Sequence, residues 1–202
     1  LNVVGEHMNG LQMAGIANIT ASKLNGVQIA LCNYATQARG LQIGLVNYYK
    51  EDMKGFQLGL VNANPDTRVQ MMVYGGNATP ANIGVRFKNQ LFYTILGIGS
   101  MYQGLNDKFS ASASYRAGLS FTLYKGLSIS GDLGYQHIEA FDNKDEVIPK
   151  RLYALQARAN LEYQFTRKFG IFATGGYGLT RFYNKSSNYD KGAIIEAGIV
   201  LF

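Results

Sequence analysis

The sequence predicts an all-β protein, specifically an antiparallel transmembrane β-barrel of about twelve strands. Three features predict this fold class: apolar residues alternate strictly with small or polar ones, the strands are long for a soluble sheet, and tight connections alternate with long polar ones. The 202 residues include 24 Gly, 14 Tyr and 11 Phe, with only 16% charged residues, which is typical of a sheet-rich chain. No apolar run reaches the ~18 residues of a transmembrane helix, whereas alternating strands agree with a mean hydropathy of -0.06.

The N-terminal part consists of repeats of one motif. Residues 40–47 read Gly-Leu-Gln-Ile-Gly-Leu-Val-Asn, and the motif recurs at 55–62, at 26–33 and more loosely at 10–18. A fifth, decayed copy covers 68–77, so the closing Asn returns about every 15 residues, as in repeat architectures. Within each copy Leu, Ile and Leu alternate with Gln, Gly and Val, which predicts a strand with one apolar face.

Two arrangements of these repeats are open. Eight residues tilted by about 40° rise only about 20 Å, less than the apolar band of a membrane, so barrel strands would have to extend into the connections. In a parallel β-solenoid, identical copies would instead stack in register and their Asn and Gln side chains would form ladders. We expect tandem strand repeats over 1–80 and a long-stranded antiparallel barrel portion over 81–202, in one continuous sheet. The alternative is an N-terminal solenoid followed by a smaller barrel or meander.

Alternation is strict in the C-terminal half. In 110–124 the apolar residues from Ala111 to Leu123 occupy one face, and Ser, Arg, Gly and Thr occupy the other. Strands of about 11 to 15 residues exceed the usual five or six of a soluble sheet and suit a membrane crossing. We expect strands near 11–18, 27–33, 41–47, 56–62, 69–75, 82–88, 91–102, 110–123, 126–138, 151–165, 169–182 and 192–202.

The connections in this half alternate in length. Lys125-Gly126 and 166–168 are tight, whereas 103–109, 138–150 and 183–191 are long and polar. Outer-membrane barrels have short periplasmic turns and longer extracellular loops. With an even strand number, the tight turns and both termini are therefore expected on the periplasmic side.

Aromatic residues on the apolar faces predict two girdles. Tyr153 and Tyr163 are ten residues apart on one face, which corresponds to about 25 Å along the membrane normal at a tilt near 40°. The expected girdles are Phe121, Tyr163, Phe165 and Phe169 on the tight-turn side, and Tyr135, Tyr153 and Tyr177 on the long-loop side. The alternative is an ordinary aromatic-rich core, because no Trp contributes to either belt.

The polar faces carry charges that we expect to meet inside the barrel. If 124–126 forms a tight hairpin, Arg116 and Asp132 become diagonal neighbours, and a plausible register of the next hairpin puts Arg158 beside Asp132. Charges in a low-dielectric lumen need partners. The expected ion-pair network consists of Arg116, Asp132, Arg158, Glu162 and Glu196. The alternative is that these groups are independently solvated in a wet pore.

The sequence offers no constellation for catalysis, so we expect no enzyme, cofactor or metal site. His7 and His137 lack spaced zinc ligands, Cys32 is the single cysteine, and phosphate loops and nucleophile elbows are absent. The net charge of +6 is not clustered and is weak evidence for nucleic acid. The chain begins at Leu1 without a signal peptide, which indicates a mature or truncated form.

The repeats resemble those of the tandem surface-repeat proteins of Gram-negative bacteria, and the C-terminal half resembles an outer-membrane β-barrel. The resemblance implies a surface location and no assigned biochemical activity. We expect a protein of the bacterial outer membrane that contacts outer-membrane lipid and has a structural or surface-interaction role, with its surface partners open. The alternatives are a small passive pore for polar solutes and a soluble β protein with a ligand cavity.

Overall fold

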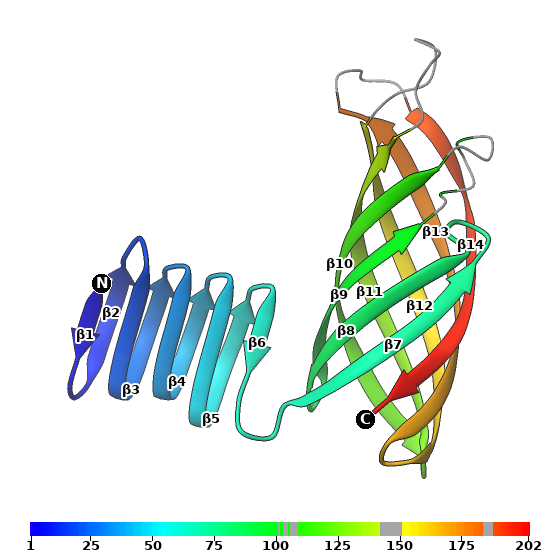
Figure 1. Cartoon of the computed structure of the whole chain (residues 1–202). Coiled ribbons are helices and arrows are strands. Elements are labelled where there is room, and N and C mark those ends of the chain that lie inside the picture. The colour runs from blue at the N-terminus through cyan, green and yellow to red at the C-terminus, as the bar shows by residue number, and fades with distance from the viewer. Residues whose placement is uncertain (101, 103–104, 106–108, 142–150, 184–187) are drawn as a thin grey trace. The chain divides into compact units, whose positions relative to one another are not determined.

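The computed structural model describes residues 1–100, 102, 105, 109–141, 151–183 and 188–202, and it contains two separate sheets. The chain divides into two compact units, one formed by Leu1–Arg68 with Phe87–Asn89 and the other by Val69–Arg86 with Gln90–Phe202 (Figure 1). The expectation of one continuous sheet is therefore wrong. The boundary lies near residue 68 and not near residue 80, because the decayed fifth repeat pairs with the second sheet.

The first unit is a parallel stack of coils, which fits the solenoid alternative. Its strands are β1 (Asn2–Val4), β2 (Met8–Met13), β3 (Ala17–Ile29), β4 (Cys32–Ile43), β5 (Val46–Leu58) and β6 (Val61–Ala63). Equivalent residues of successive repeats pair directly, as Gly26 does with Gly40 and Gly40 with Gly55. The first four repeats therefore do not form antiparallel barrel strands.

Each coil contributes two strand segments that face each other across the interior. We call wall A the segments 2–4, 17–20, 32–35, 46–48 and 61–63, and wall B the segments 8–13, 23–29, 37–43 and 52–58. Gln28 of wall B donates a hydrogen bond to Thr20 of wall A at 3.1 Å, which joins the two walls. The interior is thus lined by polar side chains and by a small apolar cluster of Leu24, Ala35 and Ala38, and not by the Leu-Ile-Leu row of the motif.

Amide ladders run along this interior. In wall B, Gln57 donates to Gln42 and Gln42 to Gln28, both at 2.8 Å. In wall A, Asn33 donates to Asn47 at 2.9 Å, and the closing Asn residues of the other repeats continue the row. Stacking identical copies satisfies buried amides that have no access to water, which explains the near-exact repeat of these two residues.

Close backbone approach between coils favours glycine at the first position of the motif, and also at the fifth position in the copy at 40–47. Gly40 has a φ of 130°, and a Cβ there would lie 2.0 Å from the carbonyl oxygen of Gly26. At Gly44 a Cβ would lie 2.3 Å from the carbonyl oxygen of Ala30. Glycine has no Cβ and adopts a positive φ readily, so it alone fits at position 40.

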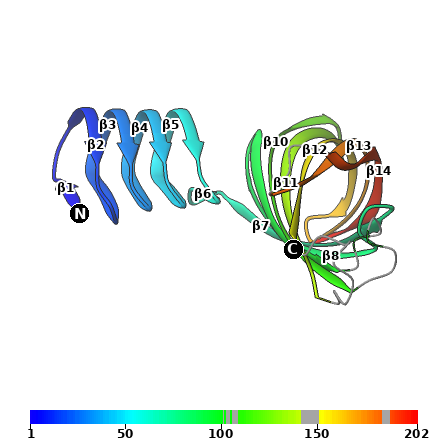
Figure 2. The same ribbon diagram turned by 90° about the horizontal axis from the view of Figure 1, so that it is seen from above.

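The second unit is a closed barrel of eight strands, and not of twelve. Its strands are β7 (Arg68–Gly76), β8 (Ala81–Asn89), β9 (Phe92–Ser100), β10 (Ser110–Tyr124), β11 (Leu127–Ala140), β12 (Arg151–Thr166), β13 (Phe169–Phe182) and β14 (Asn188–Leu201). From above, these strands form a ring (Figure 2). The count of twelve is wrong because the four segments expected at 11–18, 27–33, 41–47 and 56–62 belong to the solenoid.

Both ends of the barrel sequence lie at the tight-turn end. Leu201 of β14 pairs with Phe169, next to the turn at 167–168, and Met71 of β7 pairs with Leu201. Gly126, with a φ of 80°, completes the other tight turn. Most of the expected long loops, at 103–104, 106–108, 142–150 and 184–187, lies outside the described residues.

The barrel is polar inside and apolar outside. Along β11 every second residue from Ser128 to Ala140 is buried, including Ser130, Asp132 and Gln136, while residues between them such as Leu133, at 72%, are exposed. Exposed aliphatic and aromatic residues cover the other strands in the same way, including Ile83, Ile98, Leu119, Leu155, Leu161, Ile171 and Ile195. A water-soluble protein has the opposite distribution. Within the described part of the chain, no helix is long and apolar enough to span a membrane.

Candidate functional site in the barrel interior

The centre of the barrel interior holds an Arg–Asp pair between the first two long strands. The tight turn fixes the β10–β11 register, in which Arg116 lies opposite Gly134 and Asp132 lies opposite Gly118. The two side chains therefore meet on the diagonal, where small neighbours leave room for them. Arg116 Nε and Nη2 donate to the two carboxylate oxygens of Asp132 at 2.9 and 2.8 Å. The side chains are only 2% and 0% exposed, so this bidentate pair is removed from water.

Arg158 and Glu196 extend this pair into a four-residue cluster. Arg158 lies directly opposite Asp132 in the β11–β12 register. Glu196 of β14 approaches both arginines, with its carboxylate 3.5 Å from Arg116 Nη1 and 3.2 Å from Arg158 Nε. Two guanidinium groups and two carboxylates therefore balance in charge at the centre of the barrel.

Glu162 pairs with Arg86, a residue outside the expected network. It accepts hydrogen bonds from Arg86 Nη1 at 2.6 Å and Arg86 Nη2 at 3.0 Å. Gln70 Oε1 accepts from the remaining side of the same guanidinium, at 3.0 and 2.7 Å. Arg86 is absent from the expected network, although the sequence contains a signal for it: residues 82, 84 and 86 alternate with apolar 83, 85 and 87, which puts Arg86 on the polar face.

Neutral donors complete the coordination of Asp132. Tyr93 Oη donates at 2.8 Å and Asn160 Nδ2 at 2.9 Å to the oxygen that also accepts from Arg116. Asn160 Oδ1 in turn accepts from Arg116 at 3.0 Å and from Thr174 at 2.6 Å. Buried charges are stable only when such hydrogen bonds replace lost hydration. These side chains therefore form a connected network in the structure, in which Nε and Nη1 of Arg158 are buried without a hydrogen-bond partner.

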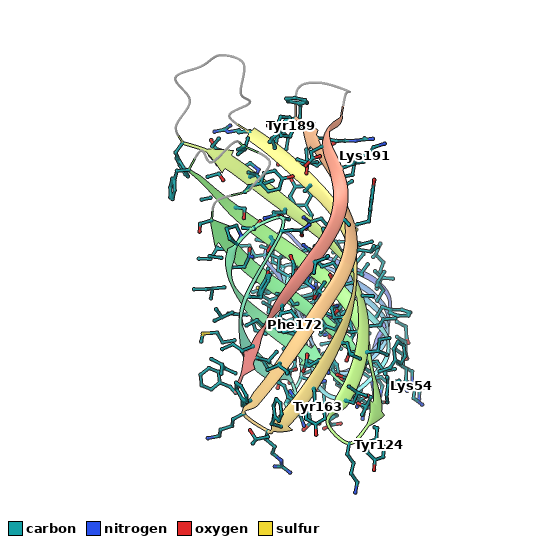
Figure 3. All side chains as sticks on the ribbon, turned by 90° about the vertical axis from the view of Figure 1, so that its right-hand side faces the viewer. Lys54, Tyr124, Tyr163, Phe172, Tyr189 and Lys191 are labelled. Carbon is teal, nitrogen blue, oxygen red and sulfur yellow. The ribbon has the colours of Figure 1, made fainter. Side chains whose placement is uncertain are left out.

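Apolar clusters lie beside the polar network and fill the remaining interior. One consists of Met72, Tyr74, Tyr93, Ile95, Phe172 and Val200; Figure 3 labels Phe172 between the two ends of the barrel. The other consists of Tyr102, Leu105, Ile138, Ala140, Leu152 and Ala154. Tyr102 and Leu105 follow β9 and pack against β11 and β12, and the hydroxyl of Tyr102 is 2.7 Å from that of Thr180.

Little empty space remains at the centre of the described interior. The cavity between the polar network and the first apolar cluster, bounded by Arg86, Arg116 and Phe172, measures about 10 Å³, which is room for about one water molecule. A larger recess of about 370 Å³ lies at the long-loop end, lined by Tyr102, Thr180 and Lys191 among others. The described interior therefore contains a recess at one end and a packed centre.

The residues expected at the tight-turn girdle form an aromatic group on the outer surface. The rings of Tyr163 and Phe165 are 4.9 Å apart, and those of Phe165 and Phe169 are 5.8 Å apart. Phe121, 48% exposed, lies on the same outer face near the other tight turn. Figure 3 shows Tyr163 at this end of the barrel and Tyr189 at the opposite end.

A second aromatic group lies near the long-loop end. Tyr135 and Tyr153 stack at 6.1 Å, and Tyr183 is 5.1 Å from Tyr153. Tyr183 was not expected here; its hydroxyl contacts Tyr135 and is 2.7 Å from His137 Nδ1. Burial and the hydrogen bond with Tyr135 raise the pKa of Tyr183 to about 12. Tyr177 is 54% exposed on the outer surface.

The described residues offer no group of three or more His, Cys, Asp or Glu side chains arranged to hold a metal ion. His137 contacts Tyr183 and Glu139, and His7 is 3.4 Å from the hydroxyl of Ser22. The carboxylates inside the barrel, those of Asp132, Glu162 and Glu196, already have arginine partners. The ion pairs of Arg86 with Glu162 and of Arg116 with Glu196 connect strands from opposite sides of the barrel.

No model of a known protein family matches the sequence, and no curated protein matches it. Several solved structures resemble the barrel. The N-terminal β-barrel domain of Pseudomonas aeruginosa OprF has a TM-score of 0.46 and 16% identity, covering 66% of this chain and 93% of that one. The Yersinia pestis outer membrane protein Ail has a TM-score of 0.41 and 14% identity, covering 67% and 99%. Neisserial surface protein A has a TM-score of 0.40 and 9% identity, covering 66% and 92%. With TM-scores below 0.5, these likenesses do not assign the chain to a family.

Proposed function

We propose that this chain is a bacterial outer-membrane protein whose barrel is a closed anchor and whose role is structural or surface-interacting. The observation that carries the proposal is the inverted barrel: apolar side chains cover its outer surface and hydrogen-bonded polar side chains fill its interior. A closed barrel satisfies all backbone groups between strands, which is the requirement for spanning lipid with β-structure.

The height of the apolar surface supports the same proposal. On β12, Tyr153 and Tyr163 belong to the two aromatic groups and are ten residues apart. At about 3.3 Å per residue and a tilt near 40°, this separation is about 25 Å along the barrel axis, the height of the apolar band of outer-membrane barrels. Outer-membrane lipid is therefore the proposed partner of the outer face.

The filled interior favours an anchor over a passive pore. An eight-stranded barrel is just wide enough for side chains to fill, and the ion pairs of Arg86 with Glu162 and of Arg116 with Glu196 cross this space. A hydrated solute needs a continuous path, but the cavity at the centre holds about one water molecule. We therefore propose that the barrel holds the solenoid at the membrane and does not conduct solutes.

The test is reconstitution of the full chain from detergent into phospholipid vesicles. We expect the unheated protein to migrate differently from the boiled protein on a gel, and planar bilayers to show no discrete conductance steps. Discrete steps would favour the pore. A chain that stays monomeric and folded without detergent or lipid would refute the membrane proposal and favour a soluble protein with a ligand cavity.

One substitution separates a lipid-facing wall from a water-facing wall. Leu133 is 72% exposed near the middle of β11, opposite Ala117 and Ala157. Leu133→Arg is expected to destabilise the folded protein in vesicles by about 2–4 kcal/mol, the cost of Arg at the bilayer midplane. Lys125→Arg, in the tight turn, is the matched control that leaves stability unchanged. In a soluble barrel Leu133→Arg would be neutral, and this result would contradict the proposal.

A further inference from the structure

Wall B of the solenoid has a strongly apolar outer face. Its strands pair in register, so equivalent side chains form continuous rows along the stack. The rows are Leu11, Val27, Leu41 and Phe56, then Met13, Ile29, Ile43 and Leu58, and at the following corner Ile16, Leu31, Leu45 and Leu60. Phe56 is 73% exposed and Ile16 is 69% exposed. The motif's apolar positions therefore build a surface and not a core.

This face results from the polar interior. The Gln and Asn ladders occupy the inside of the coils, so the residues that alternate with Gln must point outward. The outer surface of wall A also carries apolar residues, including Val3, Val46 and the stacked rings of Tyr34 and Tyr48, 5.8 Å apart. The exposed residues that follow it, Lys50 and Glu51, have opposite charges. Monomeric soluble proteins rarely expose a contiguous apolar patch without a binding partner for it.

The connection to the barrel limits what can cover wall B. Only residues 64–67 separate β6 from β7, a span of at most about 14 Å for an extended chain. β7 begins at the tight-turn end of the barrel, where Met71 pairs with Leu201. If the barrel spans the membrane as proposed, the last coil of the solenoid is attached at the tight-turn side of the membrane.

The charges beside the apolar rows suit a phospholipid surface. The row that borders them contains, in register, Asn9, Asn25, Arg39 and Lys54. This row contains two cations and no anion. Only the row of glycines at 10, 26, 40 and 55 separates it from the apolar row that begins with Leu11. Basic residues along the edge of an apolar face favour binding to anionic lipid headgroups.

We propose that wall B of the solenoid lies on the phospholipid surface at the tight-turn side of the membrane, with its apolar rows inserted at the interface. This inference rests on the proposed function, because it requires the barrel to be in the bilayer. It adds a second membrane contact, which is peripheral, to the one made by the barrel. The other occupants of wall B, a second copy of the chain or another protein, are outcomes of the test.

The absence of Trp from the sequence allows a direct measurement. Phe56→Trp puts a single tryptophan on wall B, and Tyr48→Trp puts one on wall A as the matched aromatic control. The full chain is reconstituted in vesicles with and without lipids brominated near the headgroup. We expect the emission of the Phe56→Trp variant to fall at least about twofold with brominated lipid, since interfacial side chains insert about 5–10 Å. The emission of the Tyr48→Trp variant is expected to change little.

A third variant separates failure of this inference from failure of the proposed function. Leu133→Trp reports on the barrel wall, and its tryptophan emission is expected to be quenched by lipids brominated deeper in their acyl chains. Quenching at position 133 without quenching at position 56 would overturn the inference and leave the barrel proposal standing. Wall B would then be bare, or covered by a second copy of the chain or by another protein. No quenching at either site would overturn both. Equal quenching at positions 48 and 56 would also overturn the inference, because the contact would not be sided.

The charge contribution has its own readout. In the Phe56→Trp background, Lys54→Glu reverses one cation of the bordering row, and Lys50→Glu reverses a cation beyond wall A as the control. In vesicles that contain anionic phospholipid, we expect Lys54→Glu to weaken the quenching at position 56 and Lys50→Glu to leave it nearly unchanged. Quenching that is unchanged by Lys54→Glu would overturn the assignment of this row to anionic headgroups.

Discussion

Removing one partner of the central Arg–Asp pair is expected to destabilise the barrel strongly. Asp132→Asn leaves Arg116 almost fully buried, with its nearest remaining carboxylate, that of Glu196, at 3.5 Å. Breaking a buried pair costs about 3–5 kcal/mol. Because Glu196 and Asn160 still contact the guanidinium, we expect the lower part of this range, about 3 kcal/mol.

A double-mutant cycle isolates the interaction from the effects of the single changes. Asp132→Asn, Arg116→Met and the double variant are unfolded with urea in vesicles, and the folded fraction is read from the unheated gel band. The double variant no longer has an unpaired arginine, so it should be more stable than additivity of the two single changes predicts. We expect a coupling of about 2–4 kcal/mol, within the range measured for close buried charge pairs.

The barrel contains a matched exposed pair as the control. Glu139 and Arg151 approach at 3.0 Å, close to the 2.8 Å of the central pair, but their side chains are 30% and 68% exposed. A cycle with Glu139→Gln and Arg151→Gln is expected to give at most about 1 kcal/mol, as for exposed ion pairs. Equal coupling in the two cycles would refute the argument that burial determines the strength of the central pair, and zero coupling between Arg116 and Asp132 would remove the network altogether.

Two further predictions concern the solenoid, and both are measured by limited proteolysis of residues 1–68 while the barrel's gel shift serves as the internal control. Gly44→Ala is expected to destabilise the coils by about 1–3 kcal/mol, because the new Cβ would lie 2.3 Å from a backbone oxygen. The control is Gly15→Ala, which should be neutral because a Cβ at position 15 would have no atom within 4 Å. Equal effects of the two substitutions would contradict the packing argument. Gln42→Leu leaves the side-chain amide of Gln57 and the side-chain carbonyl of Gln28 unpaired inside the ladder. Each unpaired group is expected to destabilise the solenoid by about 1–3 kcal/mol. Unchanged protease resistance would show that the ladder does not stabilise the stack.

Local patterns in the sequence predict the barrel strands and part of the site. Alternation assigns the polar face, and the tight turn at 125–126 fixes one hairpin register, so the contact between Arg116 and Asp132 can be derived without a structure. The pair formed by Glu162 and Arg86 cannot. Their strands, β12 and β8, lie four places apart in the eight-stranded ring, so their contact depends on closure of the barrel and on no local register.

The N-terminal repeats could not be assigned by alternation alone. A solenoid strand and a barrel strand both alternate polar and apolar residues, and in this protein both turn the apolar residues outward. What distinguishes them is the identity of the polar residues: Gln and Asn recur at equivalent places, and only parallel stacking brings Gln28, Gln42 and Gln57 into hydrogen-bonding register. Antiparallel strands would reverse every second copy, leaving such amides without identical neighbours.

The strand count also supports the proposed anchor over one of its alternatives, the passive pore. With twelve strands, the barrel interior would be wider than its side chains can fill, and a pore for polar solutes would follow. Transferring the four repeat strands to the solenoid reduces the ring to eight, in which Arg86, Arg116 and Arg158 reach carboxylates on other strands. The same residues that would select solutes in a wide lumen therefore close a narrow one. The charge pattern indicates a polar interior in both cases, and the number of strands determines whether that interior contains water or ion pairs.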